Sequence, residues 1–391
     1  MRAFDSGRVP PMSFGAGRLA DLPGIARDVG KGGPVLVIAD SVLAGLGVTG
    51  RLEQAFADAG VPAEIAAEIS GEPKDALADA LAGRARSMGA AVVVGLGGGA
   101  AMDAAKLVAG IACADEPALH YALCANPYPE KRLPAIAVPT TAGTGSEVTR
   151  TSIVSNAEGA KYWYWGEELM FAHAVLDPEL TVSLPPHITA WTGMDAVAHA
   201  LEAVTSRSSN AVGQAYGFQA LEILSEFLPR AVADGSDVDV RGKVLWGSTL
   251  AGLALHNCNT HMGHNISHAL GSLAPIHHGL ATGLALEVTL PALVARPEGR
   301  ENYARAAVAL GGSGYAASLP DRFAALMREC GIEASLPASC ATVSPVQLAG
   351  HMKNDYNIGM AQNAACDLTP DDLDRFAEAM LDLPRKAEKA A

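Results

Sequence analysis

The feature that most constrains the fold is a change of pattern near the middle of the chain. Before it, short apolar runs such as 34–39 and 91–95 alternate with stretches of helical periodicity. Such runs, bounded by helices, are typical of strands in a parallel sheet that is covered on both faces. After a proline-containing break at 184–186, helical periodicity recurs and strand signals nearly vanish. We therefore predict an α/β domain with a parallel sheet over 1–183 and an all-helical domain over 184–391.

Length and composition agree with two globular domains. At 391 residues the chain is long for a single core, and 49% of its residues are hydrophobic. The formal net charge of −14 argues against nucleic acid and anionic membranes as partners. Charged residues interrupt the apolar stretches, and no apolar segment of a signal peptide follows the first residues. Six cysteines without CxxC spacing are typical of reduced thiols, so we expect a soluble, cytoplasmic protein.

A glycine-rich loop separates the strand predicted at 91–95 from the next helix. Its centre is the run Gly97, Gly98 and Gly99. Glycines let the backbone approach an anionic ligand, and the free N–H groups at a helix start complement phosphate charge. A tight strand-to-helix turn without a ligand is the alternative. We favour phosphate binding, although the run is not the GxGxxG dinucleotide fingerprint.

Two further features indicate a dinucleotide. The loop 138–149 also follows a predicted strand and is dense in threonine and glycine, whose hydroxyl groups can donate to a ribose, a pyrophosphate or a carboxamide. Asp40 stands just beyond the strand that ends at Ala39. A carboxylate there can accept hydrogen bonds from an adenosine ribose and would repel a 2′-phosphate, which favours NAD over NADP. A surface turn residue fits the position of Asp40 equally well.

Histidines are crowded in the second half of the chain. Asp195 and His199 stand four residues apart, as do His264 and His268, and His278 follows ten residues later. On a helix this spacing places two side chains on the same face. One carboxylate and three imidazoles suit a first-row divalent ion, which would also offset the cost of burying a carboxylate. Spacing alone leaves open which three histidines bind.

Three other histidines lie in the same region. We expect His256, His261 and His277 to orient ligands, line a pocket or face solvent, because a metal site needs several oriented ring N–H groups.

These motifs together resemble the iron-containing (group III) alcohol dehydrogenases, which share a fold with dehydroquinate synthase. They are spread over about residues 10 to 375, and their order and spacing are highly specific. The matching elements are Gly97-Gly98-Gly99 with Asp103 and Lys106, the run from Pro139 to Thr149, Asp177-Pro178, Gly193-Met194-Asp195 with His199-Ala200-Leu201-Glu202, and His264 through His278-Gly279.

The resemblance implies roles for individual residues. It implies metal ligation by Asp195, His199, His264 and His278, with His268 near the nicotinamide and in the proton path. It further implies NAD pyrophosphate over the glycine loop, nicotinamide and ribose contacts from the threonines, and a lysine that reaches a ribose. The expected cofactor-binding residues are Asp40, Gly97, Gly98, Gly99, Ala100, Asp103, Thr140, Thr141, Thr144, Thr149 and Lys161.

Some positions depart from the family pattern and bear on substrate identity. Ala100 stands where the family usually has serine, and the stretches 259–263 and 362–366 differ from the usual sequence. By rough alignment, Thr151, Leu255 and Cys366 line the substrate pocket.

We therefore expect an NAD-linked alcohol dehydrogenase or aldehyde reductase that acts on a small alcohol or hydroxy acid, with a metal ion polarising the substrate oxygen. The resemblance favours Fe²⁺ and a homodimer, whereas nitrogen and oxygen ligands also suit Zn²⁺. Two alternatives are a dehydroquinate-synthase-like lyase that uses NAD transiently and a non-catalytic metal-binding scaffold of the same fold. The residues around the predicted ligands include few phosphate-binding lysines and arginines, which disfavours the lyase.

Overall fold

The computed structural model describes residues 3–157 and 159–386. The chain divides into two compact units, one over 8–141 and 146–182 and the other over 1–7, 142–145 and 183–391. Two short segments from the first half of the chain are thus grouped with the helical unit, and the domain bounds 1–183 and 184–391 stay predictions.

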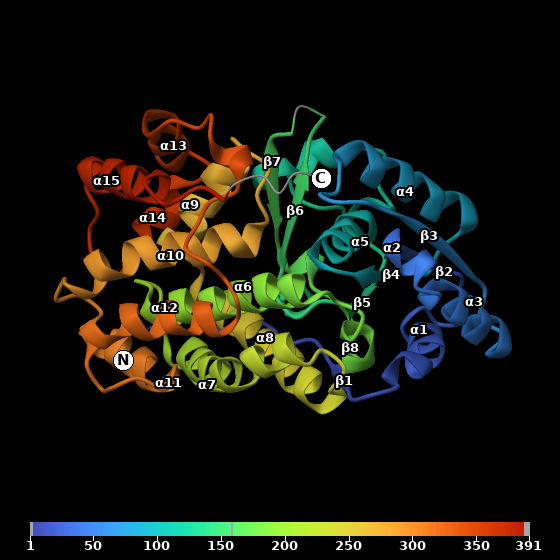
Figure 1. Cartoon of the computed structure of the whole chain (residues 1–391). Helices are drawn as coiled ribbons and strands as arrows, with labels where there is room; N and C mark the ends of the chain where they lie inside the picture. The colour runs from blue at the N-terminus through green and yellow to red at the C-terminus, as the bar shows by residue number, and fades with distance from the viewer. Residues whose placement is uncertain (1–2, 158, 387–391) are drawn as a thin grey trace. The chain divides into compact units, whose positions relative to one another are not determined.

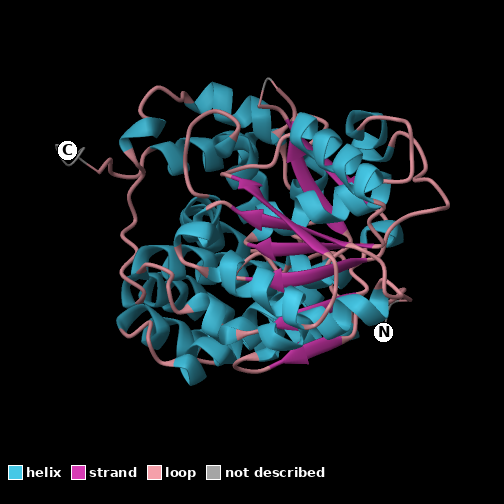
Figure 2. Cartoon of the chain, turned by 90° about the vertical axis from the view of Figure 1, so that its right-hand side faces the viewer, coloured by secondary structure: helices cyan, strands magenta, loops and turns pink. Residues whose placement is uncertain are grey.

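The first unit is built on a parallel sheet of six strands, as predicted. Its strand order is β1-β8-β5-β4-β2-β3, and Figure 2 shows the strands as neighbouring arrows with helices beside them. The interior strands β2 and β4 are buried along almost their whole length, because helices cover both faces. The strands are β1 (Met12–Phe14), β2 (Val35–Asp40), β3 (Ala63–Ile69), β4 (Val92–Gly97), β5 (Ala135–Pro139) and β8 (His173–Leu176).

The remaining elements of this unit are helices and one hairpin. The antiparallel hairpin joins β6 (Thr151–Ser155) to β7 (Lys161–Trp165). The α-helices are α1 (Leu22–Val29), α2 (Val42–Gly45), α3 (Val48–Asp58), α4 (Asp75–Met88) and α5 (Gly99–Ile111). The 3₁₀ helices are η1 (Arg18–Asp21), η2 (Ala118–Cys124), η3 (Ser146–Val148), η4 (Glu167–Leu169) and η5 (Pro178–Thr181).

The second unit is helical, as predicted, and α6 (Pro186–Thr205) lies at its centre. Nearly every residue of α6 from Thr189 onward is buried, because other helices cover it on all sides. Figure 1 shows α6 running between α10 and the antiparallel pair α7 and α8. The other helices are α7 (Ala211–Ala233), α8 (Val238–Cys258), α9 (Met262–Gly271), α10 (His278–Val294), α11 (Arg300–Ala309), α12 (Leu319–Glu329), α13 (Pro345–Met352), α14 (Ile358–Gln362) and α15 (Pro370–Leu381), with η6 (Ala316–Ser318) and η7 (Ala338–Cys340).

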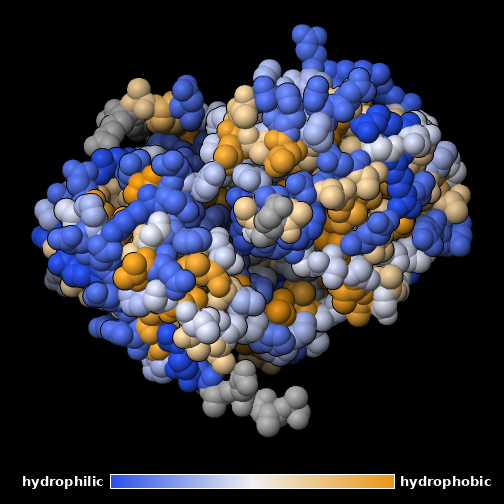
Figure 3. Space-filling view, turned by 90° about the horizontal axis from the view of Figure 1, so that it is seen from above, coloured by the Kyte–Doolittle hydropathy of each residue, from blue (hydrophilic) through white to orange (hydrophobic). Residues whose placement is uncertain are grey.

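The surface gives no sign of a membrane segment in the part of the chain that the structure describes. None of the helices there is both long enough and apolar enough to span a bilayer. On the face shown in Figure 3, hydrophobic residues lie in small groups among hydrophilic ones. Scattered apolar residues of this kind are normal on a protein surface.

Candidate metal centre and nucleotide-binding loops

Helix α6 carries three ionisable side chains along one face: Asp195, His199 and Glu202. Their spacing of four and then three residues places them on successive turns of the helix. All three are buried, with exposed fractions of 3%, 5% and 0%. Burial raises the pKa of both carboxyl groups, because the charged form loses its hydration. A helix with this much buried charge needs compensating partners.

Helices α9 and α10 bring two further histidines to Asp195. The Nε2 atom of His264 lies 3.7 Å from Asp195 Oδ1, and the Nε2 atom of His278 lies 3.5 Å from the same oxygen. The Nδ1 atom of His199 lies 4.0 Å from Asp195 Oδ2. The rings of His199 and His264 are stacked, with their centroids 4.6 Å apart. The structure therefore brings together the four residues that the sequence predicts as ligands.

Protein groups face the Nδ1 atoms of all three rings. His199 Nδ1 lies 3.3 Å from the carbonyl oxygen of Gly143, and His264 Nδ1 lies 2.5 Å from Glu202 Oε2. His278 Nδ1 lies 3.4 Å from the hydroxyl of Ser267, which can itself donate to a backbone carbonyl. A ring whose Nδ1–H donates to such an acceptor keeps its lone pair on Nε2. For His264 and His278, whose Nε2 atoms face Asp195, this is the tautomer in which Nε2 can bind a metal ion.

Unsatisfied buried atoms show that the cluster fits a cation. Asp195 Oδ1 and His264 Nε2 are buried and have no hydrogen-bond partner among the described residues. One atom from each of Asp195, His199 and His264 lies within 4.8 Å of the other two. Two atoms that bind one ion at about 2.1 Å in tetrahedral geometry lie roughly 3.4 Å apart. The Nε2 atoms of His264 and His278 lie 3.7 and 3.5 Å from Asp195 Oδ1, close to that value. His278 is therefore placed to be the fourth ligand.

The neighbouring histidines differ in their surroundings. The ring of His268 lies beside the cluster, 5.2 Å from His278 and 6.1 Å from His264 between centroids. His277 packs on Trp191, and His261 is fully buried behind Glu202. His277 and His261 thus lie outside the group of candidate ligands, in agreement with the sequence analysis.

Glu202 is the residue whose role the sequence analysis missed. It was noted only as part of the matching motif, yet its carboxylate contacts a predicted ligand directly. The signal was available in its spacing, because Glu202 stands seven residues, or about two helical turns, after Asp195.

The glycine loop lies between β4 and α5 and contacts Asp40. Strands β2 and β4 are parallel neighbours, so their carboxyl ends meet at the same edge of the sheet. Asp40 Oδ2 accepts a hydrogen bond of 2.7 Å from the backbone N–H of Gly98. Gly97 has a φ of +151°, and a Cβ there would lie 2.3 Å from Asp40 Oδ2. Only glycine therefore allows the loop to approach Asp40 this closely.

The two threonines that follow β5 lie at the same edge. The backbone N–H of Thr140 donates to the carbonyl of Gly97 over 2.9 Å, and the side chain of Thr141 faces Gly98. Ala100 follows in the first turn of α5. The structure thus brings Asp40, the glycines, Ala100 and these two threonines together, whereas Thr144 lies in the segment that belongs to the helical unit.

The other predicted cofactor residues have partners within the protein. The carboxylate of Asp103 accepts from Ser146 Oγ over 2.6 Å and from the N–H of Ile153 over 2.9 Å. Lys106 is buried and donates to Thr149 Oγ1 over 3.2 Å, and burial lowers its pKa to about 8. These contacts join α5 to the threonine-rich loop 138–149 and to strand β6.

Lys161, another predicted cofactor residue, also has a partner within the protein. It forms an ion pair with Glu72. Cofactor contacts by Asp103, Thr149 and Lys161, and by the other residues predicted to bind NAD, stay predictions.

The predicted pocket residues are spread over both units. Thr151 begins β6, Leu255 lies in α8, and Cys366 is buried just after α14. Burial raises the pKa of the Cys366 thiol. Their grouping in one substrate pocket stays a prediction.

Comparisons with known proteins agree with this geometry. A family model described as iron-containing alcohol dehydrogenase matches residues 10–178, and one described as the C-terminal part of the Fe-containing alcohol dehydrogenase family matches residues 189–342. The long-chain-alcohol dehydrogenase 1 of Geobacillus thermodenitrificans is 36% identical over 71% of this chain and 70% of its own length. The 1-propanol dehydrogenase PduQ of Salmonella typhimurium is 39% identical, and the match spans 56% of each chain.

A solved structure is similar over nearly the whole chain. The sulfoacetaldehyde reductase from Bifidobacterium kashiwanohense, crystallised in complex with NAD⁺, superposes with a TM-score of 0.89 and 28% identity. The match covers 98% of this chain and 100% of that one. The chain belongs to the iron-containing alcohol dehydrogenase family.

Proposed function

We propose that this protein is a metal-dependent, NAD(H)-linked alcohol dehydrogenase or aldehyde reductase that acts on a small alcohol or hydroxy acid. The observation that carries the proposal is the buried carboxylate oxygen Oδ1 of Asp195, which accepts no hydrogen bond from the described residues and faces the Nε2 atoms of His264 and His278. The four side chains would hold Fe²⁺, as the family description indicates, and their nitrogen and oxygen donors also suit Zn²⁺.

Each unit contributes a different part of the reaction. A divalent ion held by Asp195 and the three histidines supplies a Lewis acid that stabilises negative charge on the substrate oxygen. The N–H groups of the glycine loop and the start of α5 would anchor the NAD pyrophosphate. We assign NAD binding mainly to the unit over 8–141 and 146–182, and metal binding to the helical unit. Hydride transfer then requires the nicotinamide and the substrate carbon to meet at near-attack distance.

His268 is proposed to carry the proton between the substrate hydroxyl and solvent, because its ring lies beside those of His264 and His278. Replacing His268 by alanine is expected to lower kcat about 100-fold, as for the loss of a general acid or base, and to change its pH dependence. Steady-state rates between pH 6 and pH 10, with metal content measured in parallel, check this prediction. Wild-type turnover at every pH would remove the role.

Asp40 is proposed to select NAD over NADP. Replacing Asp40 by alanine removes the negative charge that repels a 2′-phosphate and leaves the N–H of Gly98 without its acceptor. The ratio of kcat/KM for NAD to that for NADP is expected to fall at least about tenfold, which corresponds to 1.4 kcal/mol. The exposed Asp28 in α1, replaced by alanine, is the control. An unchanged ratio in the Asp40 variant would contradict the assignment.

The activity itself is tested by absorbance at the NADH band. The protein, loaded with Fe²⁺ or with Zn²⁺, is mixed with NAD⁺ and a panel of short alcohols and hydroxy acids, and with NADH and the matching aldehydes. Net formation or consumption of NADH supports the dehydrogenase. Substrate conversion without net NADH would indicate a lyase, and no conversion of any kind would favour a non-catalytic scaffold. The panel also measures which metal gives the faster enzyme.

A further inference from the structure

We propose that Glu202 is a positioning residue of the metal centre, whose carboxylate keeps the proton on His264 Nδ1 and thereby keeps Nε2 available as a ligand. The inference deepens the proposed function and rests on it, since it takes the cluster around Asp195 as a metal site. It assigns a separate task to the second buried carboxylate of α6.

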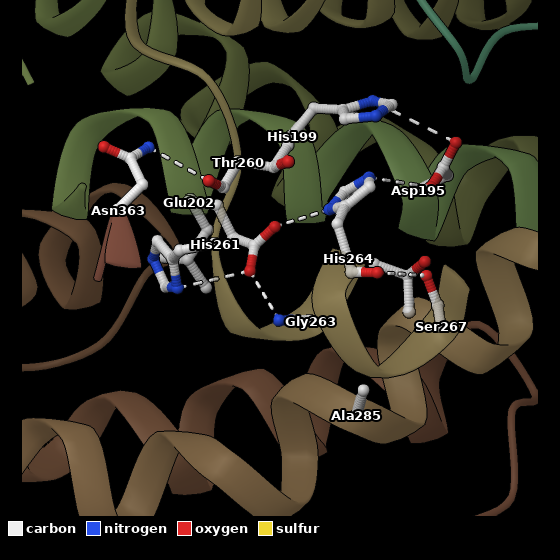
Figure 4. A network of polar contacts seen from close by, with 12 residues as sticks. Asp195, His199, Glu202, Thr260, His261, Gly263, His264, Ser267, Ala285 and Asn363 are labelled. Atoms are coloured by element: carbon white, nitrogen blue, oxygen red, sulfur yellow. Dashed lines mark hydrogen bonds and ion pairs between the residues drawn. The ribbon is translucent and has the colours of Figure 1, made fainter. Parts of the chain in front are cut away.

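The contacts of Glu202 place it directly behind His264. Figure 4 shows its side chain reaching from α6 into the space between His261 and His264. Glu202 Oε2 lies 2.5 Å from His264 Nδ1, and Glu202 Oε1 accepts from the backbone N–H of Gly263 over 2.6 Å. The Nδ1 atom of His261 lies 3.3 Å from Glu202 Oε1. Both oxygens of Glu202 therefore face donors on the first turn of α9 and the residue before it.

Asp195 differs from Glu202 in its partners, although the two are similarly buried. Their exposed fractions are 3% and 0%. Within the described part of the chain, Asp195 Oδ1 has no hydrogen-bond partner, and it faces two imidazole Nε2 atoms. One carboxylate is thus free to bind a cation, whereas protein donors occupy the other.

The tautomer of His264 follows from this contact. A neutral imidazole carries one proton, which sits on either Nδ1 or Nε2. With the proton on Nδ1, the ring donates to Glu202, and the lone pair on Nε2 faces Asp195. With the proton on Nε2, the lone pair of Nδ1 would meet an oxygen of the ionised Glu202 carboxylate, an unfavourable contact inside the protein. A carboxylate at this position selects the ligand tautomer, as in carboxylate–histidine–metal arrangements generally.

The surroundings hold Glu202 in this position. A Cβ on Gly263 would lie 3.1 Å from Glu202 Oε1 and 2.8 Å from Leu286, so a larger residue there would displace the carboxylate. On the other side, His261 Nε2 lies 3.0 Å from the hydroxyl of Thr205, which fixes the ring of His261 against the carboxylate. His261 lies in the stretch 259–263 that departs from the family pattern. In this chain an additional imidazole therefore packs beside Glu202, with its Nδ1 atom 3.3 Å from Oε1.

The test replaces Glu202 by glutamine, which has the same shape but only one acceptor oxygen. That oxygen can serve either Gly263 or His264, and the amide NH₂ then faces the remaining donor. The His264 ring is expected to take the other tautomer, with its proton on Nε2. The dissociation constants for Co²⁺ and Zn²⁺, measured by competition with a chromophoric chelator, should rise about 10- to 100-fold. The visible absorption bands of bound Co²⁺ should also shift, which a loss of stability alone would not cause.

A matched control is Glu287→Gln on α10. Glu287 is a partly buried carboxylate in the same unit, its pKa is also raised by burial, and none of its contacts reaches the cluster. This variant should bind Co²⁺ as the wild type does. Equal Co²⁺ affinities and spectra for E202Q, E287Q and wild type would overturn the inference. Failure of the wild type to bind Co²⁺ or Zn²⁺ would instead overturn the metal site itself, so the two failures are distinguishable.

A measurement on the unaltered protein covers the case in which E202Q does not fold. In the Zn²⁺-loaded protein with ¹⁵N-labelled histidine, long-range ¹H–¹⁵N correlation spectra report which ring nitrogen carries the proton. The inference requires a protonated Nδ1 on His264, with a downfield proton resonance typical of a strong hydrogen bond to a carboxylate. A proton on Nε2 of His264 would overturn it.

Discussion

Replacing Asp195 by asparagine is expected to lower kcat/KM at least about 1,000-fold and to abolish tight metal binding. The substitution removes the only carboxylate among the four candidate ligands, and with it the charge that a divalent ion needs in a buried site. A loss of about 4 kcal/mol of transition-state stabilisation corresponds to this factor. Metal content by elemental analysis and steady-state kinetics on the same preparations check the prediction.

The difference in unfolding free energy between the Asp195→Asn variant and the wild type should change sign when metal is added. Without a cation the buried carboxylate of the wild type is costly, so the asparagine variant should be at least as stable. With the ion at about 100 times its Kd, the wild type gains about 2.7 kcal/mol that the variant lacks. The exposed Asp239 on α8, replaced by asparagine, should behave as the wild type in both conditions. A metal-free Asp195 variant that unfolds well below the wild type would show that the carboxylate has a structural role instead.

Replacing Gly279 by alanine is expected to destabilise the protein by about 3 kcal/mol, as overpacking does. A Cβ at this position would lie 2.1 Å from the backbone oxygen of Trp191 and 3.0 Å from Asp195 Cβ, and backbone on α6 cannot rotate away. The first turn of α10 must therefore move, and His278, its first residue, moves with it. Urea unfolding of the metal-free protein should show the loss of stability, and metal titration should show at least about tenfold weaker binding.

Gly350 in α13 is a control because an added methyl group there has free space around it. A Cβ there meets nothing within 4 Å, so Gly350→Ala should raise helix stability by about 0.5–1 kcal/mol and leave metal binding unchanged. A Gly279→Ala variant with the urea midpoint and the metal affinity of the wild type would contradict the close packing of α10 on α6.

The elements that the sequence predicts well are those whose local pattern and tertiary environment agree. Strands β2 and β4 are short apolar runs that become the buried centre of the sheet, and α6 is a long helical pattern that becomes the core of the helical unit. Strand β3 shows the opposite case. Its alanines and glutamates favour a helix locally, and only parallel pairing with β2 makes it an edge strand.

The sequence by itself predicted the donors of the candidate metal centre: four-residue spacing on helices indicates a cluster, and the family resemblance selects Asp195, His199, His264 and His278 from it. It also determined the glycine loop, where backbone conformation restricts residue type directly. Only the tertiary structure decided which imidazole nitrogens face Asp195 and that Glu202 contacts His264. The physical reason is that tautomer and hydrogen-bond partner depend on atoms brought together by the packing of α9 and α10 on α6, which no local pattern in the chain encodes.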